Sequence, residues 1–200
     1  MNTAFLLFTL RKGFGMDINT ALMTRRTIHY WQPLPISEEA LQKSLEAAHM
    51  APCHRYTWPW RFTRVGSEAR KSIFDLTAEL KKGNHDKLPE RMKKALVRKI
   101  QNPAELIVVS MVRCDDSFTE RENYAAVSCA IQNMALSLHG SGFGSKWSTG
   151  KVTRHPNTYA LLDIDPKEEE IVGFVWVGVP EKIPDTPQRT NLDLHIRSVE

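Results

Sequence analysis

The chain has few cysteines and lacks the short motifs that mark common hydrolases, nucleotide-binding proteins and zinc proteins. Its three cysteines, Cys53, Cys114 and Cys129, are too few for a disulfide framework and show no metal-ligand spacing. The sequence contains no C-x-x-C, H-E-x-x-H, G-x-S-x-G or P-loop motif, and no G-x-G-x-x-G after a predicted strand. We therefore expect no metal site, and reduced thiols favour a cytoplasmic location.

Charge of one sign and long apolar runs are also scarce. The net charge is +4, from 27 Lys and Arg against 23 Asp and Glu, which is too small and dispersed for a nucleic-acid-binding surface. The apolar stretch Phe5–Leu10 is far shorter than the roughly 20 residues of a membrane-spanning helix, and it lacks the flanks of a signal peptide. We expect no nucleic-acid or membrane partner. Residues 1–15 are expected to form a poorly ordered extension of one domain over residues 16–200.

The sequence mixes helical and strand patterns without a regular alternation of strand and helix. Apolar spacing and capping residues predict helices over residues 17–24, 37–50, 67–82, 86–100, 117–139 and 154–162. Alternating or β-branched runs predict strands over residues 60–65, 106–112 and 171–178. This order favours an α+β fold over a doubly wound one.

Two segments suggest contact with a second subunit. The middle of the longest helix, Tyr124–Ile131, is apolar or small on every side, so we expect it to be buried in a core or between subunits. Prolines at 180, 184 and 187 predict an extended arm. The tail after it, Asn191–Ile196, alternates like an edge strand that pairs beyond its own subunit.

Gly140–Gly150 is the most informative stretch of the chain. Its four glycines allow the backbone to approach a flat ligand closely, and Trp147, Ser148 and Thr149 add an aromatic ring and two hydroxyls. This mixture suits a planar cofactor with polar edges. An ordinary turn after a helix C-cap would have a similar composition.

Three arginines are candidates for binding phosphate. Arg25 and Arg26 are adjacent, so their side chains diverge and can reach different parts of one ligand, and Thr27 adds a hydroxyl. Arg189, at the end of the proline-rich arm, is a second candidate phosphate ligand. The alternative is that all three arginines are solvent-exposed, with the first two at a helix end, where cations are favourable.

Three residues after Ala51-Pro52 also need two interpretations. His54 can donate a hydrogen bond to a carbonyl or hydroxyl group of such a planar cofactor, and Trp58 can cover a face of its ring. A loop histidine can instead be merely exposed, and a tryptophan can belong to the core. Cys53 has no resolving cysteine nearby, so we interpret it as a packing residue rather than a redox thiol.

Four segments in register resemble the flavin-binding signature of the nitroreductase family. Arg25-Arg26-Thr27 resembles the family's Arg-Arg-Ser/Thr opening, and residues 51–62 are similar to its Ala-Pro…Pro-Trp-x-Phe segment. Residues 142–150 are similar to the family's Gly-x-Gly…Trp loop, and residues 173–180 to its closing strand. The resemblance extends over residues 17–190. Many members carry Asn or Gln where Trp58 stands, and Cys53 also departs from the family pattern.

The resemblance implies a fold, a cofactor and an assembly. The fold would be a nitroreductase-like α+β arrangement with a central, mostly antiparallel sheet flanked by helices. It would form a homodimer that exchanges its C-terminal strand and binds FMN at the subunit interface. The resemblance places the FMN phosphate on Arg25 and Arg189, with Arg26 and Thr27 beside them. It places His54 and Trp58 of one subunit, and Trp147, Ser148 and Thr149 of the other, around the flavin.

The resemblance also implies a reaction. NADPH or NADH would deliver hydride to flavin N5, and the oxidised nicotinamide would leave. A nitroaromatic, quinone or activated alkene would then bind at the same face and accept the hydride, which is a ping-pong mechanism. No side chain is assigned to the catalysis itself. Two alternatives remain: a flavin-binding or storage protein without catalysis, and a related flavin enzyme that fragments or dehalogenates its substrate.

Overall fold

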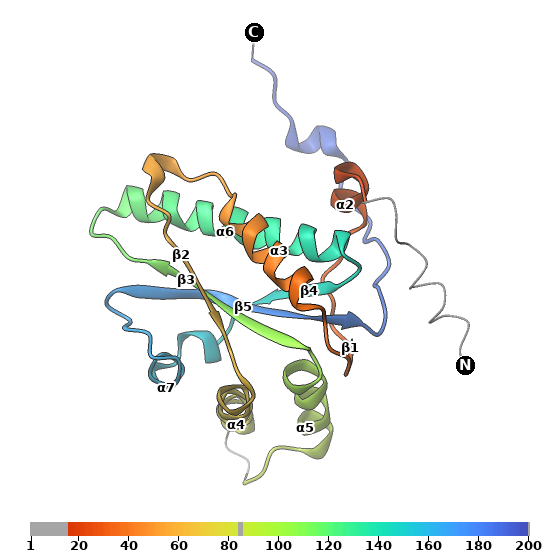
Figure 1. Ribbon diagram of the computed structural model, residues 1–200, viewed down its shortest axis with the longest axis vertical. Coiled ribbons are helices and arrows are strands. Elements are labelled where there is room, and N and C mark those ends of the chain that lie inside the picture. The colour runs from red at the N-terminus through yellow and green to blue at the C-terminus, as the bar shows by residue number, and fades with distance from the viewer. Residues whose placement is uncertain (1–15, 84–85, 200) are drawn as a thin grey trace.

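A five-stranded antiparallel sheet forms the centre of the computed structural model, which describes residues 16–83 and 86–199 (Figure 1). Its strands are β1 (Trp31–Gln32), β2 (Trp60–Arg64), β3 (Glu105–Val112), β4 (Gly144–Ser148) and β5 (Glu169–Pro180). The order is β1-β5-β3-β2, and β4 pairs with β5 as well, on the edge that β1 also uses. The prediction for residues 1–15 lies outside the described residues.

Helices cover both faces of this sheet. One face carries α3 (Glu38–His49) and α6 (Ser117–Gly140), and the other carries α4 (Ser67–Lys82), α5 (Glu90–Leu96) and α7 (Pro156–Leu161) (Figure 1). Shorter elements are α2 (Ile18–Thr24) and the single turns η1 (His54–Tyr56), η2 (Val97–Gln101), η3 (Val152–Arg154) and η4 (Leu192–His195). The predicted α+β class is confirmed, since the sheet is antiparallel and helices flank it on both sides.

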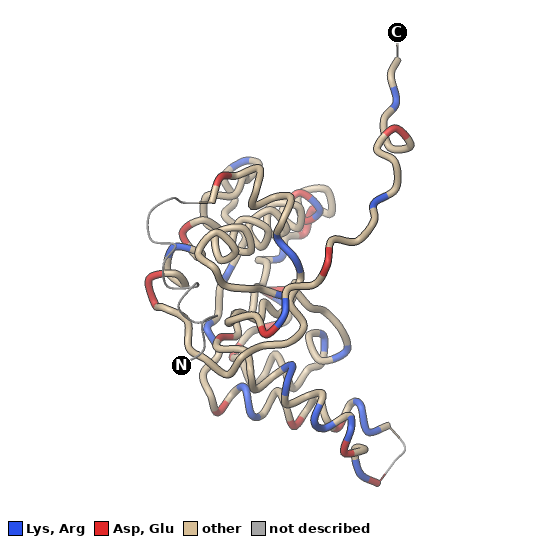
Figure 2. Tube along the Cα trace, turned by 90° about the vertical axis from the view of Figure 1, so that its right-hand side faces the viewer, with Lys and Arg blue, Asp and Glu red and all other residues tan. Residues whose placement is uncertain are grey.

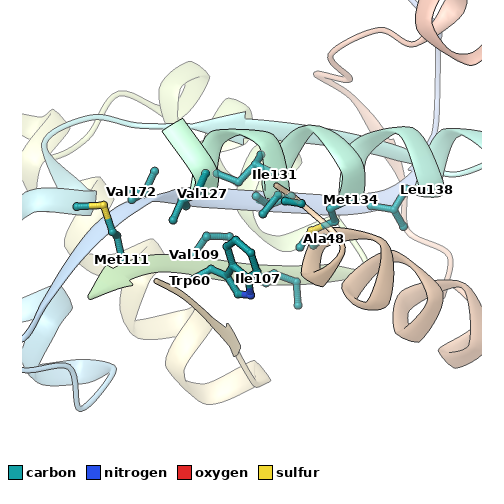
Figure 3. Packing of buried hydrophobic residues seen from close by; sticks show 14 of the residues in the cluster. Ala48, Trp60, Ile107, Val109, Met111, Val127, Ile131, Met134, Leu138 and Val172 are labelled. Carbon is teal, nitrogen blue, oxygen red and sulfur yellow. The ribbon is translucent and has the colours of Figure 1, made fainter. Parts of the chain in front are cut away.

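Each face of the sheet has its own hydrophobic core, and β3 contributes to both. Ile107 and Val109 lie in the core under α3 and α6, whereas Leu106 and Val108 lie in the core under α4, α5 and α7. Figure 3 shows the first core, in which side chains of α6 meet those of β3 and β5. Because both faces are covered, β3 reads as a continuous apolar run rather than an alternating one.

Helix ends follow the capping residues of the sequence. The predicted N-cap Ser37 accepts a hydrogen bond from the Ala40 amide at 3.1 Å and so begins α3. Asp17 and Asp116 begin α2 and α6 in the same way, with carboxylates that accept amide hydrogen bonds of the first turn. The helix predicted over residues 86–100 is shorter than expected: α5 begins at Glu90, and the wider turn η2 follows it.

Two predictions about the second half of the chain are corrected by the structure. The glycine-rich stretch is a loop only at its ends, because Gly144–Ser148 forms β4 and pairs with Gly178–Phe174 of β5. The tail forms the single turn η4 instead of the predicted edge strand, and no described residue pairs with it as a strand. Figures 1 and 2 both show this C-terminal segment leaving the body of the molecule. Exchange of the segment with a second subunit stays a prediction.

The small-residue middle of α6 is buried on only one side. Ala126, Val127 and Ala130 face the core, whereas Tyr124 is 46% exposed and Cys129 is also exposed. Burial of this segment in the core of one chain is therefore ruled out on that side, and burial between subunits, the other alternative, stays a prediction. A strip of α6 remains uncovered within the described residues.

Neither a membrane-crossing helix nor a metal-binding cluster is found in the described part of the chain. No helix over residues 16–83 and 86–199 is long and apolar enough to cross a bilayer. The same residues contain no group of three or more His, Cys, Asp or Glu side chains arranged to hold a metal ion.

Candidate flavin site

Basic side chains gather where α2 ends against the last turns of α6. Arg25 follows α2 directly and is half-buried. Burial lowers the pKa of its guanidinium, and the nearby charges of Arg26 and Arg189 lower it further. Arg189 comes from the C-terminal arm, so the fold brings together two arginines that are more than 160 residues apart in the sequence. These are the predicted phosphate ligands.

Arg26 holds the arm against α2. Its guanidinium donates to the Met23 carbonyl at 2.9 Å and the Arg25 carbonyl at 2.8 Å, and also to the Thr186 hydroxyl. Its Nε atom is buried and has no hydrogen-bond partner among the described residues. Arg26 therefore fixes the segment that carries Arg189 and keeps one donor free.

His139 is a member of this basic cluster that the sequence analysis missed. Its ring Nε2 lies 2.8 Å from the Thr24 hydroxyl, so α6 meets α2 at this point. Burial lowers the pKa of His139, as do the charges of Arg25 and Arg26. The only sequence signal was its position in the last turn of a long helix, which does not reveal what lies beside it.

β4 carries the aromatic part of the glycine-rich stretch. Gly142 has a φ of +84° just after α6, and the chain then enters β4. Trp147 is 38% exposed and lies across Gly173, with its indole N–H 3.4 Å from the Val172 carbonyl. Val172 lies at the shift of the β3–β5 register and has no paired residue on β3.

The two hydroxyl residues after Trp147 differ in role. Ser148 Oγ accepts a hydrogen bond from the Trp176 indole at 2.9 Å and donates to the Phe174 carbonyl at 3.4 Å, so it is engaged in the sheet. Thr149 is exposed at the end of β4. The predicted Thr27 reaches the same strand from the other end, through a bridge to Ser145. Thr27 therefore lies beside β4, two positions along the strand from Trp147.

His54 and Trp58 lie elsewhere, at the opposite end of α6. His54 Nε2 is 3.8 Å from a carboxylate oxygen of Glu122, in the second turn of the helix. Trp58 is 45% exposed, and its ring lies 5.6 to 6.0 Å from the rings of Tyr56, Trp60 and His49. This exposed aromatic cluster suits contact with a flat molecule. The sequence did not indicate the contributions of Tyr56 and His49.

The predicted site residues therefore form two groups within one chain. The loop of Trp58 contacts α6 at Asn123, and the basic cluster contacts it at His139. At about 1.5 Å of rise per residue, these two contacts are about 24 Å apart along the helix. One chain does not bring all predicted residues around a single flavin.

A cavity elsewhere contains none of the predicted residues. It measures about 690 Å³ and is lined by Arg64, Gly66, Arg70 and Glu105, among others, at the start of α4. Arg64 pairs there with Glu105 and Glu38, and Arg70 donates to the carbonyls of residues 103 and 104, although its buried Nε has no partner among the described residues. The open clusters at the ends of α6 remain the better candidates.

Comparison with known proteins identifies the fold and the family. Residues 22–179 match the model of the Nitroreductase family. A Bacillus subtilis protein, provisionally named as the NAD(P)H nitroreductase YfhC, is 28% identical over 171 residues, which cover 84% of this chain and 87% of that protein. A Rhodospirillum rubrum protein named 5,6-dimethylbenzimidazole synthase is 27% identical over 193 residues, covering 90% of each chain.

Two solved structures show the same fold. A nitroreductase-like family protein from Bacillus cereus superposes with a TM-score of 0.81 at 23% identity, covering 94% of this chain and 98% of that one. A protein from Desulfovibrio desulfuricans, solved in complex with FMN, has a TM-score of 0.71 at 21% identity, with 94% and 99% coverage.

These findings define an α+β protein with the nitroreductase-like fold. The chain belongs to the nitroreductase family, because the family model spans more than three quarters of its length. The predicted family resemblance is confirmed.

Proposed function

We infer that this protein is an FMN-dependent oxidoreductase that transfers hydride from NADPH or NADH to a small organic acceptor. The observation that carries the proposal is the basic cluster of Arg25, Arg26, Arg189 and His139. None of these four forms an ion pair with a carboxylate among residues 16–83 and 86–199. Burial lowers the pKa of Arg25, and the positive charges of Arg26 and Arg189 lower it further, so this cluster lacks a counter-charge, which a phosphate group would supply.

The residues present fit FMN. Arg25 and Arg189 would bind its phosphate, with Thr27 alongside and Arg26 holding the arm in place. Trp147, Ser148 and Thr149 of the same subunit would line the ring, and His54 and Trp58 of the other subunit would close the site. Bound FMN supplies the redox chemistry, because its N5 accepts and releases hydride. The protein would bind and orient FMN and leave one face of its ring open. The donor and the acceptor would occupy that face in turn, as a ping-pong mechanism requires.

A homodimer would make this site complete. In a two-fold dimer with α6 against its copy and the axis perpendicular to the helix, the two helices are antiparallel, so the N-terminal end of one lies near the C-terminal end of the other. That pairing would bring Trp58 of one subunit toward Arg25 of its partner and cover the exposed strip with Tyr124 and Cys129. The apolar side chains of the C-terminal arm, Leu192, Leu194 and Ile196, are 59–76% exposed and would then pack on the second subunit.

A visible absorption spectrum tests the cofactor and the reaction together. The purified protein is expected to show a flavin spectrum that bleaches under anaerobic NADPH or NADH and recovers when a quinone or nitroaromatic is added. The faster of the two donors identifies the nicotinamide preference. A colourless protein that fails to take up FMN would refute the cofactor, and a bound flavin that neither donor reduces would favour a storage protein.

A complementation experiment tests the shared site. Arg25→Ala and the double variant His54→Ala/Trp58→Ala damage the two groups separately, and each is expected to lose bound FMN on its own. Co-expressed, they should form mixed dimers, and random pairing restores about a quarter of the sites. Recovery of no sites would show that both groups serve the same subunit.

Analysis of the reaction products distinguishes the proposed reduction from the alternative flavin reactions. The Rhodospirillum rubrum relative is named for a synthase reaction rather than a reduction, so a fragmenting or dehalogenating flavin enzyme is the second candidate. Mass spectrometry of the FMN and acceptor after turnover separates these reactions: simple reduction keeps both carbon skeletons and any halogen, fragmentation breaks a carbon skeleton, and dehalogenation replaces a halogen by hydrogen with release of halide. We place the protein in the cytoplasm, since all three of its cysteines are free thiols.

A further inference from the structure

The loop between α3 and β2 has an unusual backbone. Arg55, Tyr56 and Trp58 have φ values of 56°, 55° and 45°, in the left-handed region that side chains other than glycine rarely adopt. Three such residues within four positions need other interactions to hold them, because each conformation is unfavourable by itself. The exposed ring of Trp58 depends on this backbone for its direction.

The thiol of Cys53 supplies such an interaction at Trp58. Its Sγ accepts a hydrogen bond from the Trp58 amide at 3.3 Å and lies 3.2 Å from the Thr57 hydroxyl. Thr57 in turn donates to Asn123 Oδ1 at 2.7 Å. Because the single hydroxyl proton is used there, the thiol proton faces two acceptors, the Thr57 hydroxyl oxygen at 3.2 Å and the His54 carbonyl oxygen at 3.7 Å, and Thr57 is the nearer of the two. A chain of hydrogen bonds thus runs from Trp58 through Cys53 and Thr57 to α6.

The series of hydrogen bonds ends at a residue that the core holds in place. Asn123 is 6% exposed and belongs to α6, the longest helix, whose inner side packs in the core shown in Figure 3. Cys53 itself packs against that core as a half-buried side chain. The thiol therefore links the backbone of the surface loop to a helix that the core holds in place.

The held conformation presents a ring cluster to solvent. Trp58 lies between Tyr56, at 5.6 Å, and Trp60, at 5.9 Å, and Tyr56 is 75% exposed. Trp60 is buried and anchors the cluster through an indole hydrogen bond to His49 at 3.1 Å. Flat aromatic molecules favour stacking on such rings.

We propose that Cys53 is a positioning residue whose thiol holds Trp58 in the conformation that forms an aromatic wall for flat acceptors. The wall, defined as Tyr56 and Trp58, sets the affinity for aromatic acceptors, and Cys53 acts on it only through the backbone of Trp58. The thiol itself undergoes no redox change. The effect on acceptors depends on the proposed function, whereas the effect on Trp58 does not.

The first test uses the apoprotein and needs no flavin. The rings of Trp58 and Trp60 are close enough, at 64° to one another, to give an exciton couplet in far-ultraviolet circular dichroism. Trp58→Phe identifies this signal by removing it. Cys53→Ala is expected to lose at least half of the couplet, whereas Cys53→Ser keeps it because a hydroxyl can replace both hydrogen bonds. Cys114→Ala, which alters a half-buried thiol outside the loop, is the matched control.

The second test separates positioning from a general loss of structure. With menadione as the aromatic acceptor, Cys53→Ala is expected to raise KM about tenfold with little change in kcat, and Cys53→Ser should restore KM. With ferricyanide, which has no ring to stack, kcat/KM per bound FMN should stay within about twofold of the unaltered protein, because any loss of flavin through Trp58 is removed by that normalisation. If Cys53→Ala fails to fold, Thr57→Val, which breaks the same chain one bond later, is measured in its place.

The outcomes are distinct. A couplet that survives in Cys53→Ala, or a KM for menadione that does not change, overturns the positioning role. Equal losses with both acceptors, or failure of Cys53→Ser to restore KM, also overturn it and favour a structural or redox role for the thiol. If the unaltered protein reduces no acceptor but Cys53→Ala loses the couplet, the proposed function fails while the positioning of Trp58 stands.

Discussion

Replacing Gly173 by alanine tests whether the sheet is shaped around Trp147. Gly173 lies in β5 next to the register shift, and the Trp147 ring crosses it. A Cβ atom added at Gly173 would come within 2.6 Å of Trp147 Cδ1, closer still to the indole nitrogen, and within 3.1 Å of the Ser148 carbonyl oxygen. The backbone oxygen cannot move without disturbing the β4–β5 pairing, so the indole must shift.

The expected cost follows from two contributions. Adding a methyl group to a packed site destabilises a protein by about 1–3 kcal/mol. A shift of the ring also weakens the hydrogen bond from the indole to Val172, which contributes about 1 kcal/mol at most for a long bond of 3.4 Å. Trp147 is 38% exposed and can turn toward solvent, which places the total near the lower end, at about 1–2 kcal/mol. For a chain of this size that lowers Tm by about 2–8 °C.

Thermal unfolding and FMN content are the assays. Gly173→Ala should unfold earlier and retain less FMN after gel filtration, since Trp147 would leave the position proposed to line the flavin. Gly140→Ala is the matched control, because its added Cβ meets no atom within 4 Å. In the double variant Gly173→Ala/Trp147→Ala the added methyl group has room. The loss of stability caused by Gly173→Ala should therefore be at most half as large in a Trp147→Ala background as in the presence of Trp147. Equal Tm values for Gly173→Ala and Gly140→Ala would refute the reasoning.

Three further predictions concern charge, pH and the core. Arg189→Ala should weaken FMN binding by at least tenfold through loss of a charge-assisted hydrogen bond, whereas Arg91→Ala, in the exposed part of α5, should not; equal affinities by fluorescence titration would remove Arg189 from the site. His139 has a pKa lowered from 6.5 in the folded apoprotein, so the unfolded chain takes up the proton first and stability falls as pH drops below about 6.5. In urea unfolding, the free energy of unfolding should fall less between about pH 7 and pH 5 for His139→Gln than for the unaltered protein. The same pH dependence in both proteins would contradict the burial of that ring. Met134→Ala, in the core under α6, should destabilise the protein by about 2–5 kcal/mol, and a loss below about 1 kcal/mol would mean that the site collapses around the gap.

Sequence patterns predicted a helix or strand correctly where residues close together in the sequence determine its formation. Ser37 begins α3 because its hydroxyl reaches an amide three residues away, and β3 is a strand because its apolar run suits a sheet covered on both faces. The family signature likewise depends on residues close together in the sequence, and the family is confirmed.

Patterns failed where a distant partner decided the structure. Residues 144–148 look like a flexible glycine loop, but β5 offers them a free edge and they become β4. The alternation of the tail predicted a strand that pairs with a second subunit, but within one chain no described strand pairs with it, and η4 forms instead. The small side chains of α6 predicted burial, yet how much of the helix is covered depends on what packs against it.

The sequence by itself determined the class of elements, the family and the residue types suited to FMN, because caps, periodicity and motifs are set over short distances. Only the tertiary structure placed His139 beside Arg25 and made the thiol of Cys53 the centre of the Trp58 loop. It also separated the predicted site residues into two groups at opposite ends of α6. The physical reason is that charge, strain and burial depend on distances in space, which sequence spacing does not determine.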